Sequence, residues 1–203
     1  MIPIAIDPRL VPIALIGAGE SMRRRIDWLR QGGAAHLTVF AEDPGLEGVV
    51  QIARMPEAEE LAQFRIIWIT GLDPTIAEPI ARDARAVGLL VNIEDHMPYC
   101  DFHTPALVRR GDLLVAISTG GKSPGLAMRL RSWLERQLTD EWAARLETIA
   151  RKRAAWRRRP RRLEELATLT DAVIDHKGWL EPIDRSQHSH HGEPAPLLAN
   201  PAH

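Results

Sequence analysis

The stretch Val11-Pro12-Ile13-Ala14-Leu15-Ile16-Gly17-Ala18-Gly19 decides how the first half of this chain folds. Its short apolar run is typical of a strand that is buried on both faces, and the run stops at a turn with two glycines. Beyond the turn, Met22, Ile26 and Leu29 recur at helical spacing until Gly32-Gly33 end the pattern. We therefore predict a buried strand, a tight turn and a helix over residues 20–32.

Apolar runs and helical patterns keep alternating as far as residue 93. Strand-like runs occupy residues 37–40, 49–52, 65–70 and 89–93, with helical patterns over residues 57–63 and 74–87. Asp73 is a suitable N-cap for the helix over 74–87, and Pro74 suits its first turn. Strands that alternate with helices indicate βαβ units, so we expect an α/β domain with a parallel sheet and right-handed crossovers.

The pattern changes after residue 104. Two strand-like runs, residues 105–108 and 113–117, flank the turn Arg109-Arg110-Gly111-Asp112, which predicts a hairpin. Helices are expected from Ser123-Pro124 to about residue 138, then in a stretch that Pro160 interrupts, and over about 161–176. The predicted organisation is an α/β domain over residues 1–112, a hairpin-plus-helices region over 113–180, and a disordered tail with prolines and histidines over 181–203.

The composition excludes several classes of protein. Of 203 residues, 45% are hydrophobic and 26% charged, which matches a soluble globular protein, and the net charge of −1 argues against a globally basic nucleic-acid binder. Cys100 is the only cysteine, so an intramolecular disulfide and a multi-cysteine metal site are excluded and a reduced, cytoplasmic setting is expected. No apolar run reaches transmembrane length, and residues 1–8 lack the basic start of a signal peptide, so we expect no membrane partner.

The small net charge conceals three segments of different sign. Residues 1–144 carry 15 basic and 19 acidic groups, residues 145–162 carry 9 and 1, and residues 163–203 carry 2 and 7. Within the middle segment, the stretch Arg151–Arg162 holds eight cations in twelve residues. Three interpretations stay open for it: a solvated helix face, a contact with nucleic acid or an acidic membrane, and a surface that steers an anionic substrate.

The turn Gly17-Ala18-Gly19 has the features of a pyrophosphate site. Small residues let the backbone approach a dinucleotide, and the helix N-terminus supplies N–H donors. Met22 stands where the usual fingerprint has a third small residue, so a plain strand–helix turn stays open as the alternative. Glu42 and Asp43 follow the second strand, where an acid binds the ribose hydroxyls and repels a 2′-phosphate, which favours NAD over NADP.

Two further motifs suggest a ligand. Asp95 follows the predicted strand 89–93, at the sheet edge where ligands bind in open α/β folds, although it could simply cap the next turn. The run Ser118-Thr119-Gly120-Gly121-Lys122-Ser123-Pro124 places a glycine loop at a helix start, whose N–H groups bind carboxylates well. The alternative for this run is an ordinary N-cap by Ser123.

These motifs together resemble the precorrin-2 dehydrogenase family, which also forms the N-terminal module of sirohaem synthase and includes some sirohydrochlorin ferrochelatases. The resemblance runs from about residue 11 to 160 and rests on Asn92-Ile93-Glu94-Asp95, Phe102, Pro105, Arg110 and the run Ala116–Pro124. It implies a Rossmann-like NAD-binding domain, then a hairpin-plus-helices dimerisation region and a helical C-terminal region. It also implies a homodimer that oxidises precorrin-2 to sirohydrochlorin, with NAD⁺ as the hydride acceptor.

The resemblance also implies roles for individual residues. Asp95 stands where the family keeps an essential aspartate, which we expect to take up a proton. The implied cofactor-binding residues are Gly17, Ala18, Gly19, Glu20, Ser21, Glu42, Asp43, Thr70 and Asp73, and the implied substrate-binding residues are Ser118, Thr119, Gly120, Gly121 and Ser123. Met22 and the run Thr70-Gly71-Leu72-Asp73 depart from the family pattern, which leaves the effect on cofactor contacts open.

Three points stay undecided in the sequence. The arginines Arg23, Arg24 and Arg25 form either a solvated helix face or a phosphate contact. A bifunctional enzyme would also insert Fe²⁺, with Asp95 and His96 taking the pyrrole protons, and a non-catalytic nucleotide sensor that associates with nucleic acid is a less favoured alternative. No metal site is predicted, because the tail histidines His188, His190, His191 and His203 have no second set of ligands at fixed spacing.

Overall fold

A five-stranded parallel sheet forms the centre of the first half of the chain. The computed structural model describes residues 2–43 and 45–180. The strands are β1 (Ile13–Gly17), β2 (Leu37–Phe40), β3 (Val50–Ile52), β4 (Ile66–Thr70) and β5 (Leu90–Ile93), in the order β3-β2-β1-β4-β5. Every neighbouring pair is parallel, so the α/β prediction is confirmed.

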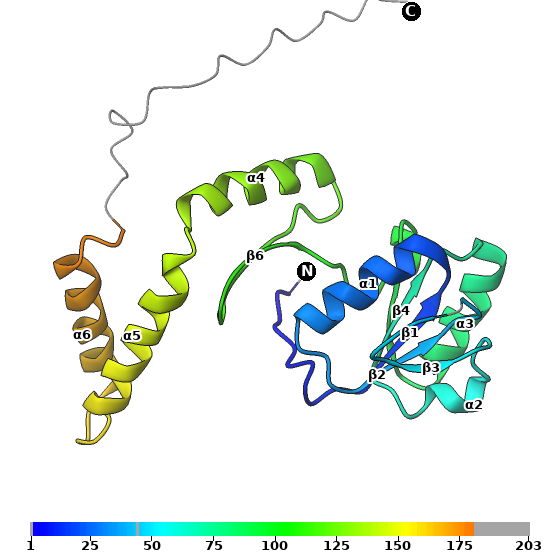
Figure 1. Cartoon of the computed structure of the whole chain (residues 1–203), viewed down its shortest axis with the longest axis horizontal. Helices are drawn as coiled ribbons and strands as arrows, with labels where there is room; N and C mark the ends of the chain where they lie inside the picture. Colours follow the sequence, from blue (N-terminus) through cyan, green and yellow to red (C-terminus); the bar gives the residue numbers. More distant parts are fainter. Residues whose placement is uncertain (1, 44, 181–203) are drawn as a thin grey trace, which may run out of the picture. The chain divides into compact units, whose positions relative to one another are not determined.

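Helices cover both faces of this sheet (Figure 1). Along β1, Ile13 and Leu15 pack into one core cluster with α1 (Gly19–Gln31), whereas Ala14 and Ile16 pack into the other with α3 (Pro74–Ala86). A short helix, α2 (Ala58–Leu61), adds Leu61 to the α3 side. Both faces of β1 are therefore buried, which is why its sequence is apolar without alternation.

The helix α3 begins as its sequence predicts. The side chain of Asp73 accepts a hydrogen bond from the Thr75 N–H at 2.9 Å, and Pro74 occupies the first turn. Ala77, Ala81 and Ala84 form the buried stripe of this helix. Small side chains on that stripe bring the α3 backbone close to the sheet, next to the carboxyl ends of β4 and β5.

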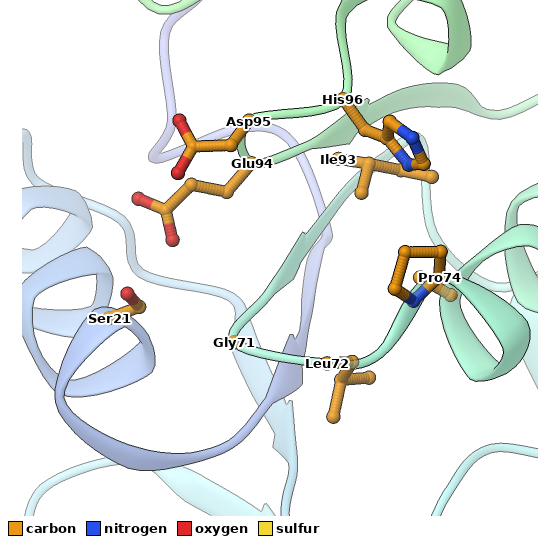
Figure 2. Close-up of a pocket in the computed structure, with 9 residues that line it drawn as sticks. Ser21, Gly71, Leu72, Pro74, Ile93, Glu94, Asp95 and His96 are labelled. Atoms are coloured by element: carbon orange, nitrogen blue, oxygen red, sulfur yellow. The ribbon is translucent and has the colours of Figure 1, made fainter.

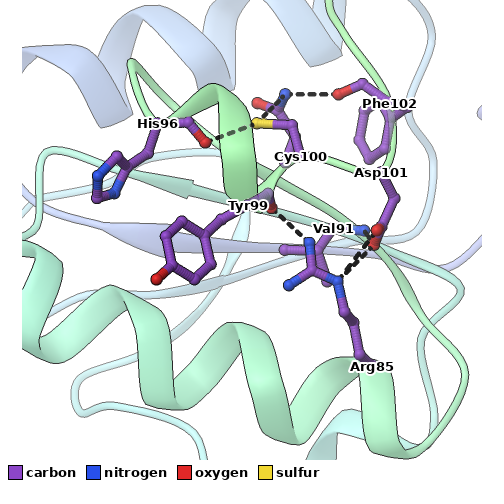
Figure 3. Close-up of polar contacts among 8 residues, drawn as sticks. Arg85, Val91, His96, Tyr99, Cys100, Asp101 and Phe102 are labelled. Carbon is purple, nitrogen blue, oxygen red and sulfur yellow. Dashed lines mark hydrogen bonds and ion pairs between the residues drawn. The ribbon is translucent and has the colours of Figure 1, made fainter.

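A segment that folds back along β5, residues 96–104, covers the outer edge of the sheet; we name it the return segment. It begins with a short 3₁₀ helix, η1 (Met97–Tyr99). The Asp101 N–H donates to the Val91 carbonyl at 2.8 Å, and the Asp101 carboxylate accepts from the Val91 N–H at 3.0 Å and from Arg85 Nε (Figure 3). The return segment thus takes the place of a sixth strand and leaves β5 without an open edge.

The remaining elements are a hairpin and three helices. The hairpin consists of β6 (Ala106–Arg110) and β7 (Leu113–Ile117), and the helices are α4 (Pro124–Gln137), α5 (Glu141–Trp156) and α6 (Leu163–His176). Residues 2–108 and 114–137 form one compact unit, and residues 109–113 and 138–180 form a second. The predicted boundary at residue 112 lies in the hairpin turn, with α4 grouped in the first unit, and the predicted tail at 181–203 lies outside the described residues.

Every helix within residues 2–43 and 45–180 is too short or too polar to cross a membrane.

The turn after β4 depends on Gly71, and this generates a stability prediction. Gly71 has φ +65°, and a Cβ there would overlap with the backbone carbonyl oxygen of Ala18. Gly88 has φ +84° with open space around the Cβ position, so Gly88→Ala costs only the left-handed conformation, about 1 kcal/mol. Gly71→Ala adds a backbone clash, so we expect it to lower the free energy of unfolding by at least about 1 kcal/mol more than Gly88→Ala. Urea denaturation measures both, and equal losses would contradict the close approach of the two turns.

Candidate functional site

A cavity of about 330 Å³ lies at the carboxyl edge of the sheet (Figure 2). It opens where the strand order reverses between β1 and β4, which is the usual ligand site of open α/β sheets. The first turn of α1, the turn after β4 with the start of α3, and the end of β5 with the turn that follows it supply its lining residues: Ser21, Gly71, Leu72, Pro74, Ala77, Ile93, Glu94, Asp95 and His96. The structure therefore brings a predicted cofactor residue, Ser21, and the predicted catalytic Asp95 to one cavity.

The glycine turn is tightly packed at Gly17, where it meets β4, and open at Gly19. A Cβ on Gly17 would overlap with the backbone of Thr70, whereas Gly19, at φ +67°, has no atom within 4 Å of its Cβ position. Ala18 is the N-cap of α1 and makes no side-chain capping bond, so the first backbone N–H groups of the helix face outward. This cradle fits a pyrophosphate, because only glycine at position 19 leaves the helix start uncovered.

Asp43 is the acid that the structure brings to this turn. Its carboxylate accepts a hydrogen bond from the Gly19 N–H at 3.1 Å and lies 3.6 Å from the Arg23 guanidinium. The side-chain amide of Gln51 donates to the Asp43 carbonyl at 2.7 Å and fixes the segment after β2. Glu42, the other predicted acid, has an exposed side chain. Asp43 is therefore the better placed of the two to meet the ribose of a bound dinucleotide.

The departure at Met22 is accommodated in the core. The Met22 side chain is fully buried in the α1-side cluster, and its Cβ lies 3.3 Å from the Cβ position of Gly17. The absence of a side chain at Gly17 therefore leaves the room that a small residue at position 22 would otherwise provide. The helix start keeps its place above the sheet despite the larger residue.

Thr70 and Asp73 have contacts that point to structural roles. Thr70 is 1% exposed and lies beneath Gly17, and its hydroxyl has no hydrogen-bond partner among the described residues. The Asp73 carboxylate accepts bonds from the Thr75 hydroxyl and N–H, which lower the pKa of Asp73. Gly71 packs against Ala18, and Leu72 gives the cavity an apolar wall. A cofactor contact through the side chains of Thr70 or Asp73 stays a prediction.

Asp95 has an unusual backbone conformation. Its φ is +61°, and among the described residues no other non-glycine has a positive φ. Such a conformation costs about 1–3 kcal/mol, and surrounding contacts must maintain it. The Asp95 and Glu94 carboxylates point to the side of the cavity on which α1 carries Ser21, whereas His96 points toward Ile93 and Pro74 (Figure 2).

The return segment holds the residues on both sides of the Glu94–Asp95 turn. The Cys100 thiol donates to the Ile93 carbonyl at 3.1 Å, and burial raises the pKa of the thiol. The same sulfur lies 3.4 Å from the His96 carbonyl (Figure 3). Asn92 donates through its side-chain amide to the Phe102 carbonyl at 2.8 Å. Both ends of the Glu94–Asp95 turn are therefore bound to the same segment.

A buried arginine ties α1 to the turn that carries Asp95. The Arg25 side chain is 14% exposed, and its guanidinium lies 3.6 Å from the Glu94 carboxylate. It stacks on Trp28, with 5.3 Å from the guanidinium carbon to the ring centroid, and donates to the Thr104 hydroxyl at 3.3 Å. Burial lowers the pKa of Arg25, and Glu94 opposes that shift.

The three arginines that follow the glycine turn lie in three different environments. Arg24 pairs with Glu20 at 3.1 Å on the exposed face, Arg23 faces Asp43, and Arg25 turns inward with its side chain 14% exposed. Glu20 is thus exposed at the first turn of α1. The contact between Arg25 and Glu94 was not foreseen from the sequence, since neither the run of arginines nor the strand pattern indicates which cation turns inward.

The loop Ser118–Ser123 has its own internal bonds and lies against the return segment. Thr119 Oγ1 accepts from the Ser123 N–H at 3.2 Å, Ser118 Oγ accepts from the Gly120 N–H at 3.2 Å, and Ser123 Oγ accepts from the Leu126 N–H at 3.3 Å. Ser123 therefore caps α4, as its ordinary interpretation predicts. Gly121 has φ +78°, a conformation that favours glycine, and the methyl group of Met97 in η1 lies against its Cβ position.

Within residues 2–43 and 45–180, no group of three or more His, Cys, Asp or Glu side chains could hold a metal ion. The tail histidines named above lie outside the described residues.

Comparisons with known proteins agree on one family. A family model described as putative NAD(P)-binding matches residues 4–106, and a model described as sirohaem biosynthesis protein central matches residues 110–137. The siroheme synthase of Methylococcus capsulatus is 33% identical over 167 residues, which cover 79% of this chain and 34% of that protein. Siroheme synthase 1 of Pectobacterium atrosepticum is 36% identical over 166 residues, 78% of this chain and 34% of that protein. The chain thus spans about one third of the length of these relatives.

A solved structure shares the fold. The structure described as "SirC, precorrin-2 dehydrogenase" aligns with a TM-score of 0.69 and 22% identity, over 92% of this chain and 96% of that one.

The open space at Gly19 generates a binding prediction. We expect Gly19→Ala to weaken NAD⁺ binding by about tenfold or more, because a methyl group there would occupy the approach to the helix start. Gly88→Ala is the matched control, since it also places alanine at a left-handed glycine in open space but lies away from the cavity. Calorimetric titration with NAD⁺ measures both variants. Equal affinity in the two would show that the dinucleotide does not bind over this turn.

Proposed function

This chain belongs to the putative NAD(P)-binding family over residues 4–106 and matches the sirohaem biosynthesis protein central family over residues 110–137, in agreement with the sequence resemblance. From that premise we propose that it oxidises precorrin-2 to sirohydrochlorin with NAD⁺. The observation that carries the proposal is that Ser21 of α1 and Asp95 of the turn after β5 line the same cavity. A dinucleotide over the glycine turn and a substrate beside Asp95 would meet there. The family model leaves NAD and NADP open, and Asp43 beside Gly19 supports NAD.

The proposed cofactor site uses the chain's backbone for the phosphates and side chains for the sugar. The outward N–H groups at the start of α1 would bind the pyrophosphate, with Arg23 beside them. The Asp43 carboxylate would exchange its bond to Gly19 for the ribose hydroxyls. When bound, NAD⁺ supplies the acceptor for the hydride that leaves the tetrapyrrole.

Removal of two hydrogens from precorrin-2 also releases a proton, and we assign its uptake to Asp95. The carboxylate lies on the cavity wall, and its left-handed backbone aims it at the side from which α1 approaches. The ion pair of Arg25 and Glu94 joins α1 to this turn. It would therefore keep a cofactor bound at α1 at a fixed distance from the Asp95 carboxylate. Arg25 and Glu94 are positioning residues in this account.

The substrate carboxylates are proposed to bind at the Ser118–Ser123 loop. Precorrin-2 carries eight carboxylates, and the loop joins two glycines with positive φ to the N-terminus of α4. The loop contacts Met97, two residues beyond Asp95. A tetrapyrrole anchored there would lie beside the return segment that follows the proposed catalytic residue.

The central prediction concerns Asp95. We expect Asp95→Asn to lower kcat for NADH formation from precorrin-2 by about 100-fold or more, because the amide cannot take up the proton. NAD⁺ affinity should stay within about twofold, since no part of the proposed cofactor cradle is changed. Asp83→Asn, at an exposed position in the last turn of α3, is the matched control and should leave kcat unchanged. A wild-type protein that forms no NADH from precorrin-2 contradicts the proposed function, and unchanged turnover in Asp95→Asn removes Asp95 from it.

A second activity, insertion of Fe²⁺ into sirohydrochlorin, has one observation in its favour. His96 lines the same cavity as Asp95, so an imidazole and a carboxylate are both available to take pyrrole protons. Incubation of the same proteins with sirohydrochlorin and Co²⁺ tests it, with the uncatalysed rate subtracted. A wild-type rate equal to the uncatalysed one contradicts this activity and leaves the dehydrogenase proposal standing.

We also propose that the chain forms a homodimer, and the apolar face of α4 supports this. Leu126, Leu130 and Trp133 share one face of this helix by their spacing, and they are 39–51% exposed. Light scattering should give twice the chain mass of 22.7 kDa, and Trp133→Glu should shift the mass toward the monomer because it places a charge in the contact. A monomeric wild-type protein at micromolar concentration would be inconsistent with a stable dimer. The cytoplasmic setting expected from the lone Cys100 stays a prediction.

A further inference from the structure

The arginine block, residues 151–162, is the most strongly charged feature outside the cavity. It spans the C-terminal turns of α5, the connection and the residues that precede α6. Seven arginines and one lysine occur in these twelve residues, with no acidic residue among them. All eight cationic residues are exposed except Arg153, which is half-buried. The cavity lies in the other compact unit, so the mechanism above makes no use of this block.

The described part of the chain neutralises little of this charge. Glu165 is the only described carboxylate within ion-pair distance, at 3.9 Å from Arg161 and 3.4 Å from Arg162. The other end of α5 is different. There Arg145 pairs with Glu141 at 2.7 Å and stacks on the rings of Trp142 and Trp179. A solvated helix face normally mixes charges of both signs, as this end of α5 does, whereas the block does not.

Helix stability accounts for only part of the block. Arg151, Lys152 and Arg153 lie at the C-terminus of α5, where cations interact favourably with the helix dipole. Arg161 and Arg162 immediately precede the N-terminus of α6, where the same dipole disfavours cations. Arg157, Arg158 and Arg159 lie between the helices, exposed, with no ion pair among the described residues. Arg161 and Arg162 share a single carboxylate, that of Glu165, and Arg158 and Arg159 have none among the described residues, so most of the charge after α5 is not explained by the stability of either helix.

We propose that the arginine block is a docking surface for the carboxylates of the tetrapyrrole, which it collects from solution; this rests on the proposed function. A tetrapyrrole with eight ionised carboxylates matches the charge of eight cations. Arginine suits this ligand because its planar guanidinium binds a carboxylate through two parallel hydrogen bonds. Exposed side chains without partners can turn toward a ligand at no cost in broken ion pairs. Such a surface raises the association rate and lowers KM without a change in kcat.

Nucleic acid is the competing polyanion, and two features of the block disfavour it. The block contains one aromatic residue, Trp156, and that side chain is half-buried, so it offers no stacking platform for bases. The rest of the chain is acidic, since residues 1–144 and 163–203 together carry 17 basic and 26 acidic groups. A duplex that contacts the block would meet repulsion from the remaining surface.

The test compares two double charge reversals of equal size. Arg157→Glu/Arg158→Glu changes the block, and Arg65→Glu/Arg82→Glu changes two exposed arginines of the first unit, before β4 and in α3. The probe for binding is uroporphyrin, a stable porphyrin with eight carboxylates, followed by quenching of tryptophan fluorescence at about 20 mM and 300 mM salt. Precorrin-2 turnover with saturating NAD⁺ gives KM and kcat for each protein. NAD⁺ titration of each variant verifies that the first unit is folded.

The expected result is a loss of at least about tenfold in uroporphyrin affinity and in kcat/KM for the block variant at low salt, with kcat unchanged. The control variant should stay within about twofold of the wild type, and the difference between the variants should shrink at high salt. If both variants have the same uroporphyrin affinity and the same KM for precorrin-2, the docking surface is overturned. Turnover of precorrin-2 by the wild type would still support the proposed function in that case. Binding of a DNA duplex by the wild type, lost in the block variant with uroporphyrin binding unchanged, would assign the block to nucleic acid and also overturn the proposal.

Discussion

The candidate site depends on the close approach of two backbone turns, at Gly17 and Gly71. A side chain on Gly17 would overlap with the backbone of Thr70, and one on Gly71 would overlap with that of Ala18. Because neither glycine carries a Cβ, the ends of β1 and β4 lie close enough for α1 and α3 to diverge from a common point. The cavity opens at that divergence, beside the start of α1, which Ala18 leaves without a side-chain cap and where Asp43 accepts from the Gly19 N–H.

The other wall of the cavity is fixed from the edge of the sheet. Asp101 satisfies both backbone groups of Val91, the carbonyl through its own N–H and the N–H through its carboxylate, and Arg85 of α3 donates to that carboxylate (Figure 3). Once the return segment is anchored in this way, the two residues after β5 have little freedom, and Asp95 takes a positive φ. The positive φ of Asp95 thus occurs in a turn that the return segment holds at both ends.

Much of this arrangement could be predicted from the sequence, because it is encoded locally. The apolar run before Gly17 predicted the central strand, Asp73-Pro74 predicted the start of α3, and the position of Asp95 after a strand predicted its place at the carboxyl edge. The inward turn of Arg25 could not be predicted, because its burial depends on Trp28, Glu94 and Thr104, which lie on three different segments. The same holds for Asp101, whose partner Val91 is set by the path of the return segment, and for Met22, whose room is left by Gly17.

The cavity and the arginine block lie in different compact units of the chain. The first unit holds the cavity, which lies at the carboxyl edge of its sheet. In the second unit, the arginine block begins in the last turns of α5, and its cations have few ion-pair partners within the described chain. On this account, one unit provides geometry for the reaction and the other provides charge for a polyanionic substrate.

The most direct test of the central claim is a crystal structure of the protein with NAD⁺ and sirohydrochlorin bound together. The account predicts the pyrophosphate at the start of α1 above Gly19, and an edge of the tetrapyrrole within hydrogen-bond distance of the Asp95 carboxylate. A dinucleotide bound elsewhere, or a tetrapyrrole bound with Asp95 out of reach, would contradict it.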